Sequence, residues 1–256
     1  MKIVTWNVGG LRACIRKGFL DYVENAKADI ILVQETHINE PLDEINALTK
    51  MGYYSTYSFA DRKGYSGTLI LHRKKPKKIA LGLDNKALDN EGRIITLSFE
   101  DFHVINVYVP NSTANLKRKY FRHDFDIAFR EHITSLTDTL PVIIGGDFNV
   151  ARSFIDVFPE NTRNEENPSG FDSEERDNLE QLLNIGLIDV HRHMYPDAQG
   201  IYTWWSNRLN KRLQNRGWRI DYFLVSDSLI DNIDSINTKM EIQGSDHCPI
   251  ELVLSL

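Results

Sequence analysis

The sequence predicts a layered α/β (α+β) domain, in which strands and helices are mixed along one chain of 256 residues. Short apolar, β-branched runs of strand length recur throughout, and helical patterns with capping residues lie between them. No linker, low-complexity tract or fixed-period repeat interrupts this order. We therefore expect one domain that spans residues 1–256.

The predicted strands are runs of apolar and β-branched residues. In chain order they are Ile3–Thr5, Ile30–Val33, Thr68–Leu71, Ile94–Phe99, Val104–Val109, Val142–Ile144, Tyr222–Val225 and Ile250–Leu254. Most have a polar residue at or beside one end, where a strand meets the edge of its sheet. These polar residues are Asn7, Gln34-Glu35, Tyr108, Asp147, Asn149, Asp221 and Asp246-His247. A sandwich of sheets would bring such side chains together.

Helical patterns are predicted at Ile15–Ala26, Pro41–Met51 and Asn115–Leu136, and a fourth begins after Asp172. The third has apolar residues near helical spacing at Leu116, Tyr120, Ile127 and Leu136. In the fourth, Asp172 and Glu175 form a capping-box pair. Leu179, Leu182 and Leu183 follow that pair, and Gly186 is the expected C-cap.

The composition is that of a globular protein, with 41% hydrophobic and 26% charged residues, which excludes disordered, collagenous and coiled-coil chains. Two cysteines, Cys14 and Cys248, are too few for a disulfide framework and fit a reducing compartment. Because the first residues are already strand-like, we expect no secretory signal peptide. The apolar runs are also far shorter than the roughly 20 residues of a membrane span. We expect a soluble, cytoplasmic protein.

The net charge of −6 hides an uneven distribution of basic residues. Residues 62–78, 112–122 and 201–220 contain 16 of the 30 Lys and Arg residues and no Asp or Glu. This segregation predicts a basic face that attracts a polyanion. The alternative is that the three runs face different directions.

Seven motifs occur in order along the chain, and together they carry a family resemblance. They are Thr5-Trp6-Asn7-Val8, Leu32-Val33-Gln34-Glu35-Thr36, Gly64-Tyr65-Ser66-Gly67, Asn106-Val107-Tyr108-Val109-Pro110-Asn111, Gly145-Gly146-Asp147-Phe148-Asn149, Gly217-Trp218-Arg219-Ile220-Asp221-Tyr222-Phe223 and Gly244-Ser245-Asp246-His247-Cys248-Pro249-Ile250. The chain resembles the exonuclease III family of apurinic/apyrimidinic endonucleases, within the wider endonuclease/exonuclease/phosphatase superfamily, over residues 2–253.

The resemblance implies a four-layer α/β sandwich of two packed, mixed β-sheets flanked by helices. It also implies a DNA repair nuclease that hydrolyses the phosphodiester 5′ to an abasic site in duplex DNA. Mg²⁺ is the implied cofactor, and Mn²⁺ is a possible substitute. 3′→5′ exonuclease activity and trimming of 3′ ends are further implied activities. We expect a monomer without an obligate protein partner.

Hydrolysis of a phosphodiester needs a divalent cation, charge-assisted donors and an oriented water. Glu35 supplies a hard oxygen ligand for the metal, and Asp246 either supports the metal's ligands from behind or is an alternative ligand. Asp147 is the expected general base, and the Asn149 amide holds the water. For Glu35 alone, the alternative is a solvated glutamate at a strand end. For Asp147 with Asn149, it is a turn whose side chains bond local backbone.

His247 is the expected donor to a phosphate oxygen, with Asp221 accepting a hydrogen bond from its other ring nitrogen. Asn7 is expected to bond the carboxylates or the phosphate. The resemblance places Tyr108 against the phosphate, although a strand tyrosine is otherwise usually part of the core.

Residues 201–220 interleave aromatic and basic side chains, as proteins that stack on bases and bind phosphates do. The aromatic ones are Tyr202, Trp204, Trp205 and Trp218, and the basic ones are Arg208, Lys211, Arg212, Arg216 and Arg219. The resemblance places Trp204, Trp218 and Ile220 around the flipped-out abasic sugar. It places Arg12, Lys17, Gly64, Tyr65 and Asn111 against the DNA strands.

The sequence departs from the family at four places. Gly9 stands where relatives carry Asp or Asn near the metal, and His37 replaces the usual lysine. Ala114 stands where some relatives insert an arginine into the duplex, and the loop Pro159–Pro168 is unusually acidic.

Two other functions fit parts of the sequence. One is a superfamily phosphatase or phosphodiesterase that acts on RNA, nucleotides or lipid headgroups with nearly the same core residues. The other is a DNA-binding module without catalysis, which the intact set of polar residues at the strand ends disfavours.

Overall fold

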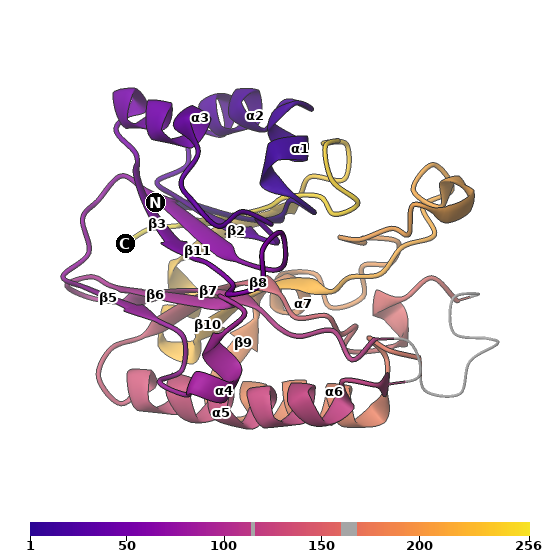
Figure 1. Ribbon diagram of the computed structural model, residues 1–256. Helices are drawn as coiled ribbons and strands as arrows, with labels where there is room; N and C mark the ends of the chain where they lie inside the picture. The colour runs from indigo at the N-terminus through magenta and orange to yellow at the C-terminus, as the bar shows by residue number, and fades with distance from the viewer. Residues whose placement is uncertain (114–115, 160–167) are drawn as a thin grey trace.

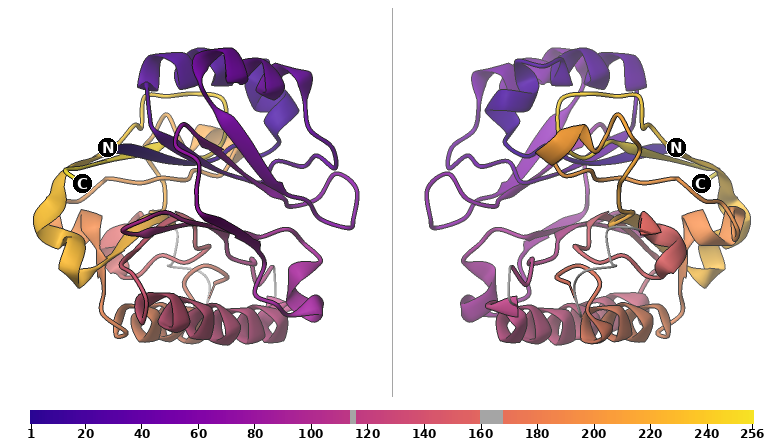
Figure 2. Two further views of the ribbon diagram at one scale, coloured as in Figure 1. Left: turned by 90° about the vertical axis from the view of Figure 1, so that its left-hand side faces the viewer. Right: turned by 90° about the vertical axis from the view of Figure 1, so that its right-hand side faces the viewer.

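Two six-stranded β-sheets pack face to face, with helices on the outer side of each (Figure 1). The computed structural model describes residues 1–113, 116–159 and 168–256. The features expected at Ala114, at Asn115 and in most of the loop Pro159–Pro168 lie outside the described residues. The arrangement of layers, seen from two sides in Figure 2, confirms the predicted four-layer sandwich.

The first sheet has the strand order β11-β12-β1-β2-β4-β3. Its strands are β1 (Lys2–Asn7), β2 (Ile30–Gln34), β3 (Tyr54–Ser58), β4 (Thr68–His72), β11 (Ile233–Thr238) and β12 (Ile250–Leu254). β1 and β2 are parallel, and Asn7 lies beside Gln34 in their register. Asn7 and the residue after Gln34, Glu35, therefore reach the same edge of the sheet.

The second sheet has the order β5-β6-β7-β8-β10-β9. Its strands are β5 (Lys78–Leu81), β6 (Ile94–Ser98), β7 (His103–Tyr108), β8 (Val142–Asp147), β9 (Leu187–Asp189) and β10 (Asp221–Ser226). β7 and β8 are parallel and end together at Tyr108 and Asp147. β10 is antiparallel to β8 and begins with Asp221 opposite Asp147. Three predicted site residues thus share one edge.

Helices cover the outer face of each sheet (Figure 1). α1 (Leu11–Ile15), α2 (Phe19–Ala26), α3 (Asp43–Asn46) and η1 (Ala47–Met51) lie over the first sheet. α5 (Lys119–Thr137) and α6 (Ser173–Leu183) lie over the second. The shorter helical segments are α4 (Lys86–Asp89), η3 (Phe154–Asp156), α7 (Val190–Met194), η5 (Arg208–Asn210) and η6 (Asp227–Asn232).

All eight predicted strands are present, and four further strands, β3, β5, β9 and β11, were not predicted. The helix expected at Ile15–Ala26 is wrong as a single element, because α1 ends at Ile15 and α2 begins after Gly18, whose φ is 102°. The helix expected at Pro41–Met51 is the short α3 followed by a 3₁₀ turn.

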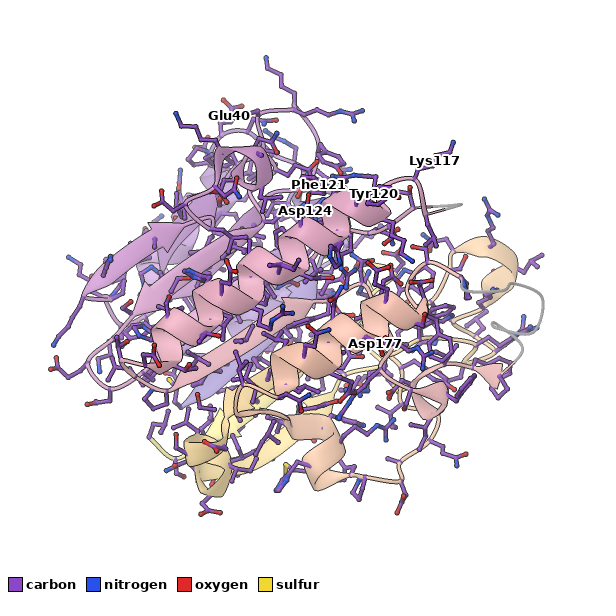
Figure 3. All side chains as sticks on the ribbon, turned by 90° about the horizontal axis from the view of Figure 1, so that it is seen from below. Glu40, Lys117, Tyr120, Phe121, Asp124 and Asp177 are labelled. Carbon is purple, nitrogen blue, oxygen red and sulfur yellow. The ribbon has the colours of Figure 1, made fainter. Side chains whose placement is uncertain are left out.

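The longest helix, α5, begins at Lys119, and its buried face differs from the predicted one. Phe125, Phe129 and Ile133 face the core, whereas Tyr120 is 87% exposed. Figure 3 shows α5 beside α6, with Tyr120 and Asp124 labelled on α5. The predicted apolar stripe is therefore wrong at Tyr120, whereas Leu136 packs against the core as expected.

The fourth helix agrees with its prediction at the N-terminal end. Asp172 caps α6 and forms the capping box with Glu175. Leu179, Leu182 and Leu183 are buried as expected. The C-cap is Asn184, and Gly186 comes two residues later with a φ of 92°. Among the described residues, no helix combines the length and apolar character that crossing a membrane requires.

Candidate active site

Polar side chains from both sheets meet in a cavity of about 220 Å³ at the edge where β1, β2, β7 and β8 end. The cavity, called the site pocket below, is lined by Glu35, Tyr108, Asn111, Asp147, Asn149, Ser169, Gly170, Trp204, Trp218, Ile220, Asp246 and His247. The sequence predicted all of these as site residues except Ser169 and Gly170. The structure therefore brings together residues that lie up to about 210 positions apart in the chain.

Asn7 joins the carboxylates of the two sheets. Its Nδ2 donates to Glu35 Oε1 and to Asp147 Oδ2, each at 2.8 Å. Its Oδ1 accepts from the backbone N–H of Gly9 at 3.0 Å. Asn7 is fully buried, so its orientation is set by these three hydrogen bonds.

Glu35 is held as an ionised carboxylate. Burial alone would raise its pKa, but hydrogen bonds from His37 and Asn7 outweigh burial and lower the pKa to about 2. The His37 Nε2 lies 3.1 Å from Glu35 Oε2. Glu35 has a left-handed backbone, with φ of 53°, a strained conformation that often marks functional positions.

Asp147 and Asn149 form a turn whose side chains face the pocket. The Asn149 backbone N–H donates to Asp147 Oδ1 at 2.8 Å. The Asn149 side chain donates to Val109 O at 2.9 Å, and its Oδ1 accepts from Asn111 at 2.9 Å. Burial, followed by the negative charge of Asp221, raises the pKa of Asp147. A raised pKa makes this carboxylate a stronger base.

His247 lies between two carboxylates. Asp221 Oδ2 is 2.8 Å from His247 Nδ1, and Asp147 Oδ2 is 3.9 Å from His247 Nε2. Burial opposes the positive charge of the imidazolium, but Asp221 and then Asp147 outweigh burial and raise the pKa of His247. With Nδ1 bonded to Asp221, the Nε2 proton points toward Asp147.

Glu35 and Asp147 could hold a metal ion. Among the described residues these two and His247 form one group whose ligand atoms all lie within 4.8 Å of one another. Two carboxylates in this group offer the hard oxygen donors that Mg²⁺ prefers, so the donor set fits such an ion. The predicted ligand Asp246 lies outside this group, and its Oδ2 accepts from Trp204 Nε1 at 3.1 Å.

Tyr108 lines the same pocket. The Tyr108 ring lies under the buried Arg93 guanidinium at 4.4 Å, and burial, followed by the charge of Glu35, raises the Tyr108 pKa.

Gly9 has a φ of +53°, and a Cβ there would lie 3.2 Å from Asp246 Oδ1. A longer residue at position 9 would therefore crowd Asp246.

The apolar wall of the site pocket consists of Trp204, Trp218 and Ile220. The two indole rings meet edge to face, with centroids 6.3 Å apart. Trp218 and Ile220 also pack against Phe171 in a small apolar cluster. A Cβ on Gly170 would lie 3.2 Å from the Trp218 ring, so glycine lets the chain pass close to the indole.

The sequence profile of the Endonuclease/Exonuclease/phosphatase family matches residues 4–247. The chain belongs to this family. An exodeoxyribonuclease of Bacillus subtilis is 41% identical, with all of both chains covered. A DNA-(apurinic or apyrimidinic site) endonuclease of Dictyostelium discoideum is 40% identical over all of this chain and 71% of the relative. The solved structure of a 3′ phosphatase from Neisseria, bound to a product DNA hairpin, is 26% identical, covers 100% of both chains and has a TM-score of 0.89.

The residues predicted to contact DNA come from several separate segments of the chain. Arg12 and Lys17 are exposed. Lys17, Lys211 and Arg212 line a second cavity of about 430 Å³ beside Gly9 and Asp246. In another loop, the exposed Gly64 precedes Tyr65, which is half-buried. The Tyr65 hydroxyl accepts from Arg118 at 2.6 Å.

The Arg212 side chain forms hydrogen bonds within the protein. Its guanidinium donates to the carbonyls of Ser245 at 2.8 Å, Met240 at 3.1 Å and Ile242 at 2.5 Å, and it lies over the Trp205 ring. It thus holds the segment that leads to Asp246.

Several residues expected at a DNA surface are buried. Trp205 is 2% exposed and Tyr202 is 4% exposed. Arg219 and Arg122 are buried and paired with carboxylates, so they add nothing to a basic face. The interpretation of these four as surface residues is wrong, because composition gives the residue type without the direction of the side chain.

Proposed function

We propose that this nuclease hydrolyses the phosphodiester 5′ to an abasic site in duplex DNA, with Mg²⁺ as its metal and Mn²⁺ as a possible substitute. The observation that carries the proposal is the site pocket itself. One small cavity is lined both by the polar side chains of Glu35, Asp147 and His247 and by the apolar wall of Trp204, Trp218 and Ile220. A sugar that lacks its base fits such a wall, while the adjoining phosphate meets the polar side chains.

Asp147 takes a proton from the attacking water, and its raised pKa suits that role. Asn149, fixed by Val109 and Asn111, orients the same water. His247 donates a hydrogen bond from Nε2 to a phosphate oxygen, and Asp221, which accepts from Nδ1, keeps the ring protonated for this role. A divalent ion held by the carboxylates of Glu35 and Asp147 would neutralise the charge that builds up on the phosphate.

Selectivity follows from the cost of rotating a nucleotide out of the duplex. An abasic sugar has already lost its stacking and pairing, so it enters the pocket at lower cost than an intact nucleotide. The wall of Trp204, Trp218 and Ile220 then excludes a nucleotide that still carries its base.

The relatives support DNA as the substrate, since they include an exodeoxyribonuclease and an endonuclease for apurinic or apyrimidinic sites. The DNA hairpin bound to the Neisseria 3′ phosphatase supports it as well. Nucleases of this family depend on metal ions. We further propose that residues 1–256 act as one domain and as a monomer. The buried thiols Cys14 and Cys248 fit the reducing cytoplasm.

The test uses purified protein with Mg²⁺ on labelled duplexes that carry an abasic site, a uracil, a 3′-phosphate or no lesion. We expect incision 5′ to the abasic site, with degradation from 3′ ends as a weaker activity. Trp218→Ala should lower the ratio of abasic to undamaged cleavage by roughly tenfold, because discrimination by the shape of an apolar pocket is worth about 1–3 kcal/mol. Lys17→Ala should instead weaken binding to every duplex and lower the salt slope by about one. A folded Trp218→Ala protein with an unchanged ratio would remove Trp218 from substrate selection.

A further inference from the structure

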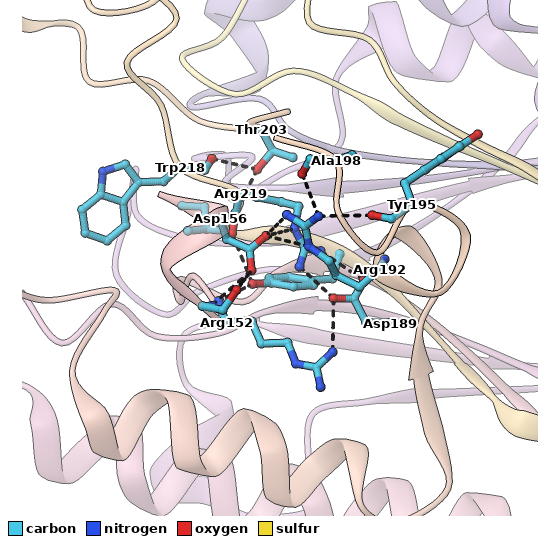
Figure 4. A network of polar contacts seen from close by, with 12 residues as sticks. Arg152, Asp156, Asp189, Arg192, Tyr195, Ala198, Thr203, Trp218 and Arg219 are labelled. Carbon is cyan, nitrogen blue, oxygen red and sulfur yellow. Dashed lines mark hydrogen bonds and ion pairs between the residues drawn. The ribbon is translucent and has the colours of Figure 1, made fainter. Parts of the chain in front are cut away.

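Arg219 lies between two residues of the pocket wall, Trp218 and Ile220, but its side chain does not line the pocket. In extended backbone, alternate side chains point to opposite sides, which places Arg219 behind the wall. Figure 4 shows the Trp218 indole and the Arg219 guanidinium on opposite sides of this segment. The Arg219 side chain is 1% exposed.

The buried guanidinium is fixed by two carboxylates from different parts of the chain. Its Nε donates to Asp156 Oδ1 at 2.7 Å. Its Nη1 and Nη2 donate to the two oxygens of Asp189 at 3.1 and 2.8 Å. Such a two-pronged contact fixes direction as well as distance, because the guanidinium is planar.

A second arginine bonds the same oxygen of Asp156. Arg192, on α7, donates to Asp156 Oδ1 from Nε at 3.1 Å and from Nη2 at 2.5 Å. The backbone is joined as well, since the Arg219 N–H donates to the Asp156 carbonyl at 2.8 Å. The pocket wall is thus tied to η3, to the end of β9 and to α7 (Figure 4).

The same segment leads directly into the catalytic residues. Thr203 Oγ1 accepts from the backbone N–H of Ile220 at 3.0 Å and of Asp221 at 3.1 Å. Asp221 then bonds His247. A shift of Arg219 would therefore move the apolar wall relative to the Asp221–His247 pair.

We infer that Arg219 is a positioning residue that sets the shape of the pocket wall and so the preference for a base-free sugar. The inference rests on the proposed function. Buried ion networks are weak sources of net stability, because desolvation offsets much of their attraction, whereas their directional bonds specify one geometry. With a looser wall, an intact nucleotide would enter more readily and discrimination would fall.

The test compares wild type with Arg219→Gln and Arg219→Lys on abasic and undamaged duplexes. The readout is the ratio of abasic incision to degradation of undamaged duplex, which does not depend on the fraction of protein that is folded. We expect Arg219→Gln to lower this ratio by roughly tenfold, because displacements near 1 Å can cost up to about 100-fold in rate. Arg219→Lys keeps the charge without the planar fork, and its ratio should fall between those of Arg219→Gln and wild type.

Ile236→Ala is the matched control for lost stability. Ile236 is buried in β11 of the first sheet and is not part of the pocket. This variant should melt at a lower temperature and keep the wild-type ratio. If its ratio falls as well, general loss of stability explains the effect and the inference is overturned.

Asp156→Asn covers the case in which Arg219→Gln does not fold. It removes one charged partner at constant size and should shift the ratio in the same direction. The inference would be contradicted if Arg219→Lys and Asp156→Asn both fold and both keep ratios within about twofold of wild type. A change that small is well below the effect that a displaced pocket wall should produce. A wild-type enzyme without preference for abasic DNA would instead contradict the proposed function.

Discussion

The side chain of Gln34 donates a hydrogen bond of 2.7 Å to Oδ1 of Asn106 across the interior between the two sheets. Asn106 in turn donates to the carbonyls of Val33 at 3.0 Å and Leu69 at 2.9 Å. Both amides are fully buried. Since Glu35 follows Gln34 directly in sequence, this pair joins the sheets close to the site pocket.

Asn106→Leu should destabilise the protein by about 2–4 kcal/mol, because it removes one of the two acceptors of the buried Gln34 amide, the other being Thr5 Oγ1, and deprives two carbonyls of a donor. Urea unfolding at neutral pH measures the change. Asn25→Leu, at an exposed position of α2, is the control and should change stability by at most about 0.5 kcal/mol. A loss below about 1 kcal/mol for Asn106→Leu would mean that the amide network contributes little.

The strands that sequence reasoning missed are β3, β5, β9 and β11, the outermost strands of the two sheets. Edge strands pair on one side only and remain in contact with water, so their sequences need not be apolar. β11 reads IDSINT, and β5 begins within a basic run with Ile79 48% exposed. The eight predicted strands fill the interior of both sheets, where burial on both faces demands apolar residues.

The polar residues of the site were predictable because their motifs are specific and stand at strand ends. The supporting residues were not. Arg219 was assigned to the DNA surface, although it stands between two pocket residues and faces Asp156 and Asp189. Its partners lie 63 and 30 positions away in the chain, and no local pattern of the sequence reports such pairings.

Removal of divalent metal should abolish cleavage. Excess EDTA is expected to stop incision of abasic duplex, and added Mg²⁺ should restore it, because the carboxylates of Glu35 and Asp147 meet in the site pocket. Glu35→Gln should raise the Mg²⁺ concentration for half-maximal activity by roughly tenfold or more, since it removes a charged ligand. Robust cleavage in excess chelator would contradict a metal-dependent mechanism.

Asp221→Asn should reduce kcat by about 10²–10⁴-fold and leave DNA binding within about threefold of wild type. The neutral amide can accept from Nδ1 but no longer stabilises the positive charge of His247, so the ring loses its second proton and Nε2 no longer donates. Single-turnover rates and binding in EDTA measure the two effects separately. Asp234→Asn, at an exposed position of β11, is the control and should change neither. Equal losses of binding and turnover in Asp221→Asn would indicate a structural role instead.

His191 should make the folded protein less stable in acid. It is 7% exposed on α7, and its Nε2 has no hydrogen-bond partner among the described residues. Burial and then the positive charge of Arg219, with a smaller contribution from Arg192, lower its pKa to about 4, against the opposing effect of Asp189 and Asp156. The unfolded chain, whose histidine pKa is about 6.5, therefore binds the proton first as the pH falls.

Titration of His191 should consequently leave the free energy of unfolding unchanged above pH 7. As the pH falls from about 6.5 toward 4, the same titration should lower the free energy of unfolding by about 2–3 kcal/mol in total. Urea unfolding of wild type and His191→Phe between pH 7.5 and 4.5 isolates this contribution, since every other titrating group is common to both proteins. The stability of wild type relative to the variant should fall by that amount over this range. His191→Gln removes the same titration with different packing, so it should give the same pH-dependent difference around another constant offset. A wild-type-to-variant difference that stays constant with pH in both variants would show that His191 keeps an ordinary pKa in the folded protein.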